Sequence, residues 1–370
     1  KETRKLIRRS KRINPNAFIT LIGCYAQLKP EELIDIKDVN LVLGTADKFD
    51  LLNHLDKIDT SDDIKSSIGG NINDIKIFNP SFSNDDRTRS FLKVQDGCDY
   101  SCTFCTIPLA RGRSRSSSIN KTINIAKDIS RTNTKEIVLT GINIGDFGKG
   151  TNESFYDLIK QMDSQIDIER FRISSIEPNL LNDKIIEFCF QSKKFMPHFH
   201  IPLQSGSNKM LKSMKRRYTS QEYSDRLNKI KSLDKDACIG VDVIVGYPTE
   251  SEEDFFETYN FLKNHDVSYL HVFTYSEREN TKAIKLEPVV PYEERARRSK
   301  ILRELSDQKR VNFYERSVGQ IRPVLVEKSK NGILFGYTDN YIKTRIQGHI
   351  SLENTICLLY TSDAADESSS

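Results

Sequence analysis

Residues 97–105 read Gly-Cys-Asp-Tyr-Ser-Cys-Thr-Phe-Cys, so Cys98, Cys102 and Cys105 fall within eight residues of sequence. Three thiolates this close together can bind one metal centre. A structural zinc site needs four ligands, and residues 85–150 contain no fourth cysteine and no histidine. Three cysteines on a four-iron cluster leave one iron open to a further ligand. The spacing therefore favours an iron–sulfur site over a zinc site.

The cysteines follow the first of six β-branched, apolar runs, which recur about every 30 to 45 residues with amphipathic helical patterns between them. This alternation predicts a parallel, partly closed barrel of strand–helix units. Chemistry in such a barrel is expected at the carboxyl ends of the strands, where the cysteines fall. The predicted strands are Phe91–Gln95, Glu136–Leu139, Arg170–Ser174, His198–Pro202, Ile239–Val245 and Tyr269–Thr274.

Shorter elements flank the barrel on both sides. A small α/β domain is predicted first, with helices over 3–12, 30–36 and 48–55 and strands over 17–23 and 40–44. A helix over 292–316 follows the barrel, and then a hairpin of 321–327 and 333–337 joined through Asn331-Gly332. The predicted fold class is thus α/β, with an N-terminal domain (1–57), a linker (58–88), a partial (β/α)6 barrel (89–316), a small all-β module (317–356) and a tail (357–370).

An open iron can bind the amino and carboxylate groups of S-adenosylmethionine (SAM), and the surrounding residues resemble a branch of the radical SAM superfamily. Residues 91–116 read Phe-Leu-Lys-Val-Gln-Asp-Gly-Cys-Asp-Tyr-Ser-Cys-Thr-Phe-Cys-Thr-Ile-Pro-Leu-Ala-Arg-Gly-Arg-Ser-Arg-Ser. This run is similar to the methylthiotransferases, and its Gln-Asp-Gly-Cys version is most similar to those acting on N6-threonylcarbamoyladenosine in tRNA. Further similar stretches are 20–27, 139–145, 174–178, 200–207, 214–219 and 242–250, so the resemblance covers residues 1 to about 355.

The resemblance implies an enzyme that inserts a methylthio group at C2 of the modified adenosine beside the anticodon. It implies two 4Fe-4S clusters and SAM as cofactors, a radical SAM barrel, and a C-terminal RNA-binding module of the TRAM type. One SAM is cleaved reductively so that a hydrogen atom can be abstracted, and a second SAM methylates sulfur at the auxiliary cluster. The implied partners are tRNA and an electron donor such as flavodoxin or ferredoxin.

The resemblance also assigns residues to the cofactors. Cys98, Cys102 and Cys105 are the implied ligands of the SAM-cleaving cluster. Taken alone, residues 140–143 are equally consistent with a tight turn, and most of the other implied SAM contacts are better explained as core packing or turns. These contacts are Phe104, Thr140, Gly141, Asn143, Ser175, Glu177, Gln204, Ile244 and Gly246.

Cys24 matches the last of three cysteines that hold the second cluster in this family, and the other two are absent. Taken alone, it is a small apolar residue at the end of a strand. Because the sequence opens at Lys1, we expect an N-terminal truncation, loss of the second cluster, and SAM cleavage with little methylthiolation of tRNA. Residues 357–370 resemble a translated sequencing adapter and are expected to be non-native.

RNA contacts are predicted from local basic clusters, because 56 basic and 52 acidic residues give a net charge of only +4. Such clusters can neutralise phosphates. Any one of them taken alone is better explained as a solvated face, and the prediction depends on several clusters occurring together. The predicted contacts are Arg111, Arg113, Arg115, Lys215, Arg216, Arg217, Lys328 and Lys330.

The sequence contains no apolar run of 18 residues and no secretory leader pattern, so a cytoplasmic protein without membrane contact is expected. The oligomeric state is left open, with a monomer as the default. Two other functions compete with a tRNA methylthiotransferase. A ribosomal-protein aspartate methylthiotransferase shares the fold and chemistry, whereas a non-catalytic iron–sulfur RNA-binding protein would not cleave SAM.

Overall fold

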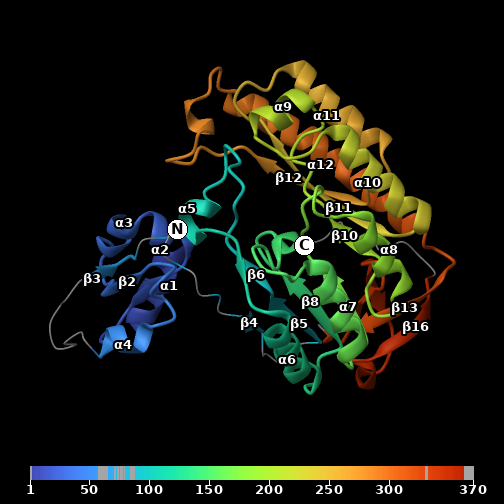
Figure 1. The fold of residues 1–370 in the computed structure, drawn as a ribbon, viewed down its shortest axis with the longest axis horizontal. Coiled ribbons are helices and arrows are strands. Elements are labelled where there is room, and N and C mark those ends of the chain that lie inside the picture. The colour runs from blue at the N-terminus through green and yellow to red at the C-terminus, as the bar shows by residue number, and fades with distance from the viewer. Residues whose placement is uncertain are drawn as a thin grey trace. The chain divides into compact units, whose positions relative to one another are not determined.

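The computed structural model describes residues 2–56, 66–70, 72, 75, 78, 80–83, 88–329 and 332–361 (Figure 1). The chain divides into two compact units. The first comprises Lys1–Ile77, Gly97–Ser101 and Cys105–Ser114, and the second comprises Phe78–Asp96, Cys102–Phe104 and Arg115–Ser370. Cys98 and Cys105 therefore belong to the first unit and Cys102 to the second.

The first unit contains a parallel sheet of strand order β1-β2-β3. Its elements are α1 (Glu2–Ile13), β1 (Thr20–Ile22), α2 (Cys24–Leu28), α3 (Pro30–Ile34), β2 (Leu41–Leu43), α4 (Leu51–Leu55), β3 (Ser66–Ile68) and α5 (Ile107–Arg111). Ile7, Leu33 and Val42 pack together as part of its small apolar core. The predicted α/β alternation is confirmed, with shorter strands than the apolar runs.

Two parts of the predicted linker are strands, β3 and the two-residue β4 (Ser81–Phe82). Residues 66–68 form β3, which pairs in parallel with β2, Val42 lying opposite Ser67. The sequence Ser-Ser-Ile has no alternating apolar pattern, so its pairing depends on β2 rather than on its own preference. Most of the remaining predicted linker lies outside the described residues.

The second unit is built around the predicted partial barrel. Strands β5, β8 and β9 pair in parallel, as do β10, β11 and β12, and parallel bridges such as Ser175 to His200 connect the two groups. All six predicted strands are confirmed. Their bounds are β5 (Arg89–Lys93), β8 (Glu136–Thr140), β9 (Arg170–Ile173), β10 (His198–His200), β11 (Cys238–Val245) and β12 (Tyr269–Thr274).

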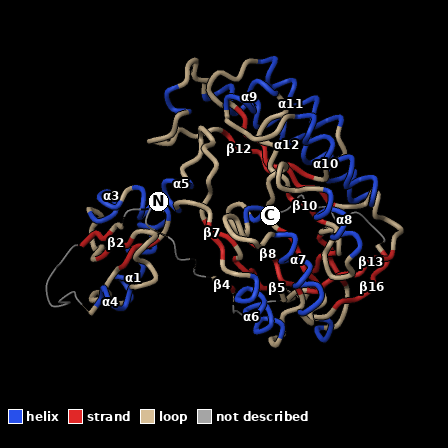
Figure 2. The backbone as a smooth tube through the Cα atoms, in the orientation of Figure 1, coloured by secondary structure: helices blue, strands red, loops and turns tan. Residues whose placement is uncertain are grey.

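Helices cover the outer face of these strands (Figure 2). They are α6 (Ile119–Ser130), α7 (Phe155–Gln165), α8 (Asp183–Gln191), α9 (Asn208–Ser213), α10 (Ser220–Leu233), α11 (Glu252–Asn264) and α12 (Tyr292–Glu315). Ser118, Ser154 and Ser251 cap the first turns of α6, α7 and α11 by accepting backbone N–H groups. Phe171 and Phe199 belong to the large core under the helices.

Alternate strand residues point to the inner face, which is polar. Arg172 on β9 donates two hydrogen bonds to the Glu136 carboxylate on β8, each of 3.0 Å. Both side chains are buried, with 3% and 2% of their surface exposed. Burial opposes ionisation of Glu136, but the neighbouring Arg172 outweighs it and lowers the pKa of the carboxyl. The inner face thus contains a buried, fully charged pair.

An antiparallel sheet of strand order β15-β14-β13-β16 follows α12. Its strands are β13 (Ile321–Val326), β14 (Leu334–Thr338), β15 (Lys343–Ile346) and β16 (Ile356–Tyr360). Arg170 on β9 donates hydrogen bonds to the carbonyls of Tyr337 and Pro323 in this sheet. Tyr341 stacks on His198 of β10, with 4.4 Å between ring centroids. The small module therefore packs directly against the barrel strands.

Residues 357–360, which the sequence analysis set apart as a non-native tail, belong to this sheet. They form most of β16, which pairs with β13, so that Cys357 lies opposite Val324. Cys357 and Leu359 also pack against the apolar core of the module. The rest of the tail, residues 362–370, lies outside the described residues.

Two short strand pairs complete the fold, β4 (Ser81–Phe82) with β5 and β6 (Gln95–Asp96) with β7 (Arg115–Ser116).

Candidate active site

The cysteine loop begins directly after β6 at Gly97. Gly97 has a φ of +71°, and a Cβ at this position would lie 2.0 Å from the Arg113 carbonyl oxygen. A residue with a side chain therefore cannot make this turn, which sends the chain into the loop. None of the seven cysteines forms a disulfide, and Cys98, Cys102 and Cys105 are all half-buried.

Each of the three loop sulfurs accepts a hydrogen bond from a nitrogen. The Tyr100 and Ile107 backbone N–H groups donate to Cys98 and Cys105, both at 3.4 Å. The Arg216 guanidinium donates to the Cys102 Sγ at 3.1 Å. Thiolates with N–H donors on their sulfurs are the usual ligands of iron–sulfur clusters, so this donor set fits a 4Fe-4S cluster.

Arg216 joins Cys102 to a predicted SAM contact. Its guanidinium also forms an ion pair with Glu177, and only 3% of its side chain is exposed. Burial raises the pKa of the Cys102 thiol, and the positive charge of Arg216 opposes that rise. The prediction that Arg216 contacts RNA phosphates needs correction, because the side chain is buried at Cys102. Its place in the Lys-Arg-Arg run 215–217 is typical of an exposed basic cluster, so no local pattern signals its burial.

Gln95 supports the loop after β8, where two SAM contacts, Gly141 and Asn143, are predicted. Its buried Oε1 accepts hydrogen bonds from the backbone N–H groups of Ile142 and Asn143, at 3.0 and 2.8 Å. A Cβ on Gly141 would lie 3.1 Å from Gln95 Oε1. Asn143 is 2% exposed, and its Oδ1 accepts no hydrogen bond from the described residues. This buried acceptor fits a polar ligand at the end of β8.

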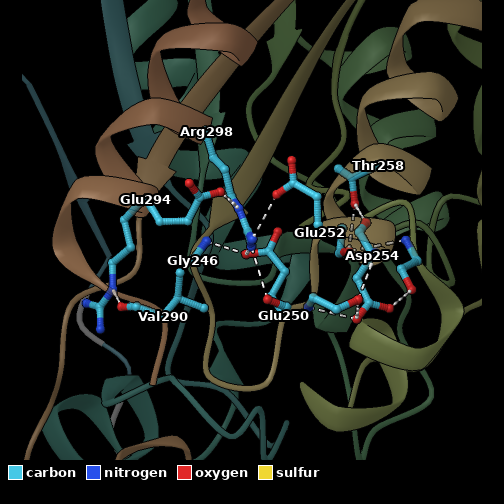
Figure 3. Close-up of polar contacts among 12 residues, drawn as sticks. Gly246, Glu250, Glu252, Asp254, Thr258, Val290, Glu294 and Arg298 are labelled. Atoms are coloured by element: carbon cyan, nitrogen blue, oxygen red, sulfur yellow. Dashed lines mark hydrogen bonds and ion pairs between the residues drawn. The ribbon is translucent and has the colours of Figure 1, made fainter. Parts of the chain in front are cut away.

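Two further predicted contacts lie at the carboxyl end of β11. Ile244 is in the strand itself, and Gly246 follows the strand directly (Figure 3). Gly246 has a φ of +72°, and a Cβ there would lie 2.3 Å from Cγ of Arg295. Its backbone N–H donates to the Glu250 carboxylate, which also lies 3.3 Å from Arg298. Arg298 in turn contacts the Gly246–Glu250 turn through the Glu250 carbonyl, at 3.1 Å. Sequence reasoning gave no role to Glu250, although it ends the quoted stretch 242–250.

We expect the stability of the protein to depend on pH through Glu250. Burial raises the pKa of its carboxyl to about 7, against the opposing effect of Arg298. With a raised pKa, the folded state holds the Glu250 proton more tightly than the unfolded state does. Protonated Glu250 therefore contributes its full stabilisation below pH 4.5, and this stabilisation is lost as the pH rises through 7. Urea unfolding at pH 5 and pH 8 should show the parent losing stability relative to Glu250→Gln between the two values.

The matched control is Glu252→Gln, which changes a nearby carboxylate that is 46% exposed. The stability difference between the parent and this control should stay the same at both pH values. An equally constant difference for Glu250→Gln would contradict the raised pKa.

The other predicted SAM contacts lie at strand ends of the second unit. Phe104 packs beside an apolar cluster that includes Met214 and Tyr247. Ser175 bridges to His200, and Gln204 bridges to Val243 with a φ of +68°. Thr140 is the last residue of β8. The second unit thus brings all nine predicted contacts to the carboxyl ends of its strands or the loops that follow them.

The predicted RNA contacts fall into two groups. Arg113, Lys215, Arg217 and Lys328 are exposed, and Lys330 lies outside the described residues. Arg115 forms an ion pair with Asp96 at 3.0 Å, and only 9% of its side chain is exposed, so it has little surface to offer a phosphate. Within the first unit, Arg111 donates to Cys24 Sγ at 3.1 Å. Runs of basic residues in the sequence therefore predicted exposed cations correctly but also included cations that the fold largely buries.

The barrel and its three-cysteine loop define a radical SAM protein. The model of the Radical SAM superfamily matches residues 92–262. Among solved structures, the cobalamin-dependent S-adenosylmethionine radical enzyme OxsB is similar with a TM-score of 0.50 and 16% identity, covering 80% of this chain and 45% of that one. This likeness shows the fold alone.

Curated relatives place the chain more narrowly. Threonylcarbamoyladenosine tRNA methylthiotransferase MtaB of Bacillus subtilis (strain 168) is 41% identical over 361 residues, covering 94% of this chain and 79% of the relative. The tRNA-2-methylthio-N(6)-dimethylallyladenosine synthase of Endomicrobium trichonymphae is 30% identical, covering 92% and 79%. The chain belongs to the radical SAM methylthiotransferase family. Members of this superfamily use SAM and a 4Fe-4S cluster, which the cysteine loop fits.

No helix among the described residues is long and apolar enough to cross a membrane.

Proposed function

We propose that this protein inserts a methylthio group at C2 of N6-threonylcarbamoyladenosine in tRNA. The observation that carries the proposal is the loop of Cys98, Cys102 and Cys105, each sulfur accepting an N–H bond, in a chain 41% identical to a relative named for that reaction.

Cys98, Cys102 and Cys105 would hold the 4Fe-4S cluster, which when bound supplies the electron that cleaves SAM. The chain's own residues position and shield that chemistry. Arg216 places a buried positive charge against the Cys102 sulfur, which stabilises it as a thiolate. Gln95 fixes the loop at Asn143, whose buried Oδ1 can accept a hydrogen bond from the amino group of SAM.

Cys24 would be one of three cysteine ligands of a second 4Fe-4S cluster, and without the other two we expect this chain not to retain that cluster. The contact from Arg111 supports this assignment, because a charge-assisted hydrogen bond to sulfur stabilises a thiolate ligand. Arg111, which is also a predicted RNA contact, lies in α5 and donates this hydrogen bond through its guanidinium.

The sheet of β13 to β16 would act as a TRAM-type RNA-binding module. Phosphates of the RNA would be contacted by the exposed cations Arg113, Lys215, Arg217 and Lys328. An electron donor such as flavodoxin or ferredoxin would reduce the cluster, and the protein would act as a cytoplasmic monomer. Because phosphate contacts release counterions, binding should weaken steeply as salt rises.

The proposal is tested with an anticodon stem–loop that carries deuterium at C2 of its threonylcarbamoyladenosine. Anaerobically reconstituted protein with SAM and dithionite should transfer deuterium into 5′-deoxyadenosine, seen as a mass increase of one unit. The same stem–loop without the threonylcarbamoyl group is the control and should transfer far less label. Unlabelled 5′-deoxyadenosine with both RNAs, or label drawn instead from a β-deuterated aspartate of a ribosomal protein, would contradict the proposed substrate.

A further inference from the structure

Three polar side chains meet on the inner face of β10, β11 and β12. His200, Asp242 and His271 each offer a nitrogen or oxygen atom, and these atoms lie within 4.8 Å of one another. His200 Nε2 lies 2.8 Å from Asp242 Oδ1, and the His200 and His271 rings meet edge to face with centroids 5.4 Å apart. We call these residues the inner-face triad.

Strand register explains why the triad forms. Asp242 on β11 lies directly opposite His271 on β12, so the two side chains point to the same face. His200 on β10 is paired with Gly240, two residues before Asp242 on that same face. Val241 and Val243 alternate with these positions and pack into the core under the helices. The triad is therefore a product of sheet geometry.

The triad lies one step inside the proposed SAM contacts. Ile244 follows Asp242 by two residues on the same face of β11, and Ser175 is bridged to His200. A group bound at the triad would therefore lie next to the carboxyl ends of the strands, where the reaction is expected.

The triad is also open to a ligand. His200 and Asp242 each keep 19% of their side-chain surface exposed, and His271 is exposed. His271 lines an open groove of about 430 Å³ along the edge strand β12, together with Phe273 and Arg303. A large substrate can therefore reach His271 from the side of β12, where Arg303 and Arg310 outweigh Asp307 and leave the groove positive toward a phosphate.

The chemistry of the triad suits a polar, acidic substituent. Imidazole N–H groups donate hydrogen bonds to a carboxylate, and the Asp242 carboxylate accepts them from a hydroxyl or a ureido N–H. A threonylcarbamoyl group carries all of these functions, whereas a dimethylallyl group would leave the triad buried without partners. The geometry points to His200, Asp242 and His271 as the binding site for the threonylcarbamoyl substituent, an inference that rests on the proposed tRNA substrate.

The test measures affinity for three anticodon stem–loops by fluorescence anisotropy with the reconstituted chain. The loops carry adenosine, dimethylallyladenosine or threonylcarbamoyladenosine at the same position. The parent should bind the threonylcarbamoyl loop at least about tenfold more tightly than the unsubstituted loop. His271→Ala and the isosteric Asp242→Asn should each remove most of that ratio while leaving the affinity for the unsubstituted loop unchanged, which also shows that they fold.

The matched control is His349→Ala, which removes an exposed histidine of the C-terminal module and should leave the ratio unchanged. Equal parent affinity for all three loops would contradict the proposed substrate. If the parent preferred the threonylcarbamoyl loop and the triad variants showed the same preference, the role of the triad would be overturned while the proposed substrate would stand. Two histidines and an aspartate also suit a divalent metal. If EDTA removed the preference for the threonylcarbamoyl loop and added Zn²⁺ restored it, the triad would be a metal site and the proposal would be overturned.

Discussion

Replacing Cys98, Cys102 and Cys105 together by alanine is expected to abolish the formation of 5′-deoxyadenosine from SAM. Each sulfur accepts an N–H bond in the structure, and without the thiolates no soft ligand remains in the loop to hold iron. The measurement is anaerobic reconstitution with iron and sulfide, addition of SAM and dithionite, and quantification of 5′-deoxyadenosine by mass spectrometry. The loss should be complete, because the substitution removes all three protein ligands of the cluster at once.

The matched control is Cys189→Ala. Cys189 is 3% exposed in the core under the helices, where burial raises the pKa of its thiol, so it offers no thiolate. This variant should retain SAM cleavage and the iron content of the parent. Continued production of 5′-deoxyadenosine by the triple variant would show that the loop is not the SAM-cleaving site, and no production by a parent with a verified cluster would favour a binding protein.

Glu136→Ala is expected to destabilise the protein by about 3–5 kcal/mol. The substitution removes the bidentate partner of Arg172, whose side chain is 3% exposed, and leaves its charge buried without compensation. The nearby Arg89 and Arg170 add to the cost, because Glu136 interacts favourably with both of them. Urea unfolding at pH 7 measures the effect as a fall in the midpoint with an unchanged slope.

Two variants separate the burial of charge from simple loss of contacts. Glu169→Ala breaks an ion pair with Lys135 in which the glutamate is 44% exposed, and it should cost about 1 kcal/mol or less. The double variant Glu136→Leu/Arg172→Met should recover much of the lost stability by removing both charges together. A cost below about 1 kcal/mol for Glu136→Ala would mean that solvent reaches the pair.

The six barrel strands could be predicted because each one alternates or runs apolar over four to eight residues and is followed by a helical pattern. The strand Ser66–Ile68 was missed because its pairing comes from β2 and not from its own residues. The strand Ile356–Tyr360 was missed because its sequence was read as foreign, although apolar positions in it face the module core. A strand with a clear local pattern can be predicted from its own residues. A strand with a weak local pattern forms only because of a partner strand that is distant in the sequence.

The residues of the candidate site also divide into those that could be predicted from the sequence and those that could not. The three cysteines could be found because their spacing is itself the signal. Gln95 and Glu250 could not be assigned roles, because each acts through backbone N–H groups that only the folded loop presents to it. Arg216 was misread because a run of basic residues predicts exposure, and burial at Cys102 depends on a contact 114 residues away.

The packing of the small sheet against β9 has a consequence for synthesis of the chain. Arg170 hydrogen-bonds to the Tyr337 carbonyl and Arg172 to the Asp339 carbonyl, each across 167 residues. At about 5–20 residues per second, the ribosome adds those acceptors roughly ten to thirty seconds after the arginines emerge. During that interval the nascent barrel holds guanidinium groups whose final acceptors do not yet exist. The contacts of Arg170 and Arg172 with the small sheet can therefore form only once residues 323–339 have been synthesised, well after the barrel strands that carry the arginines.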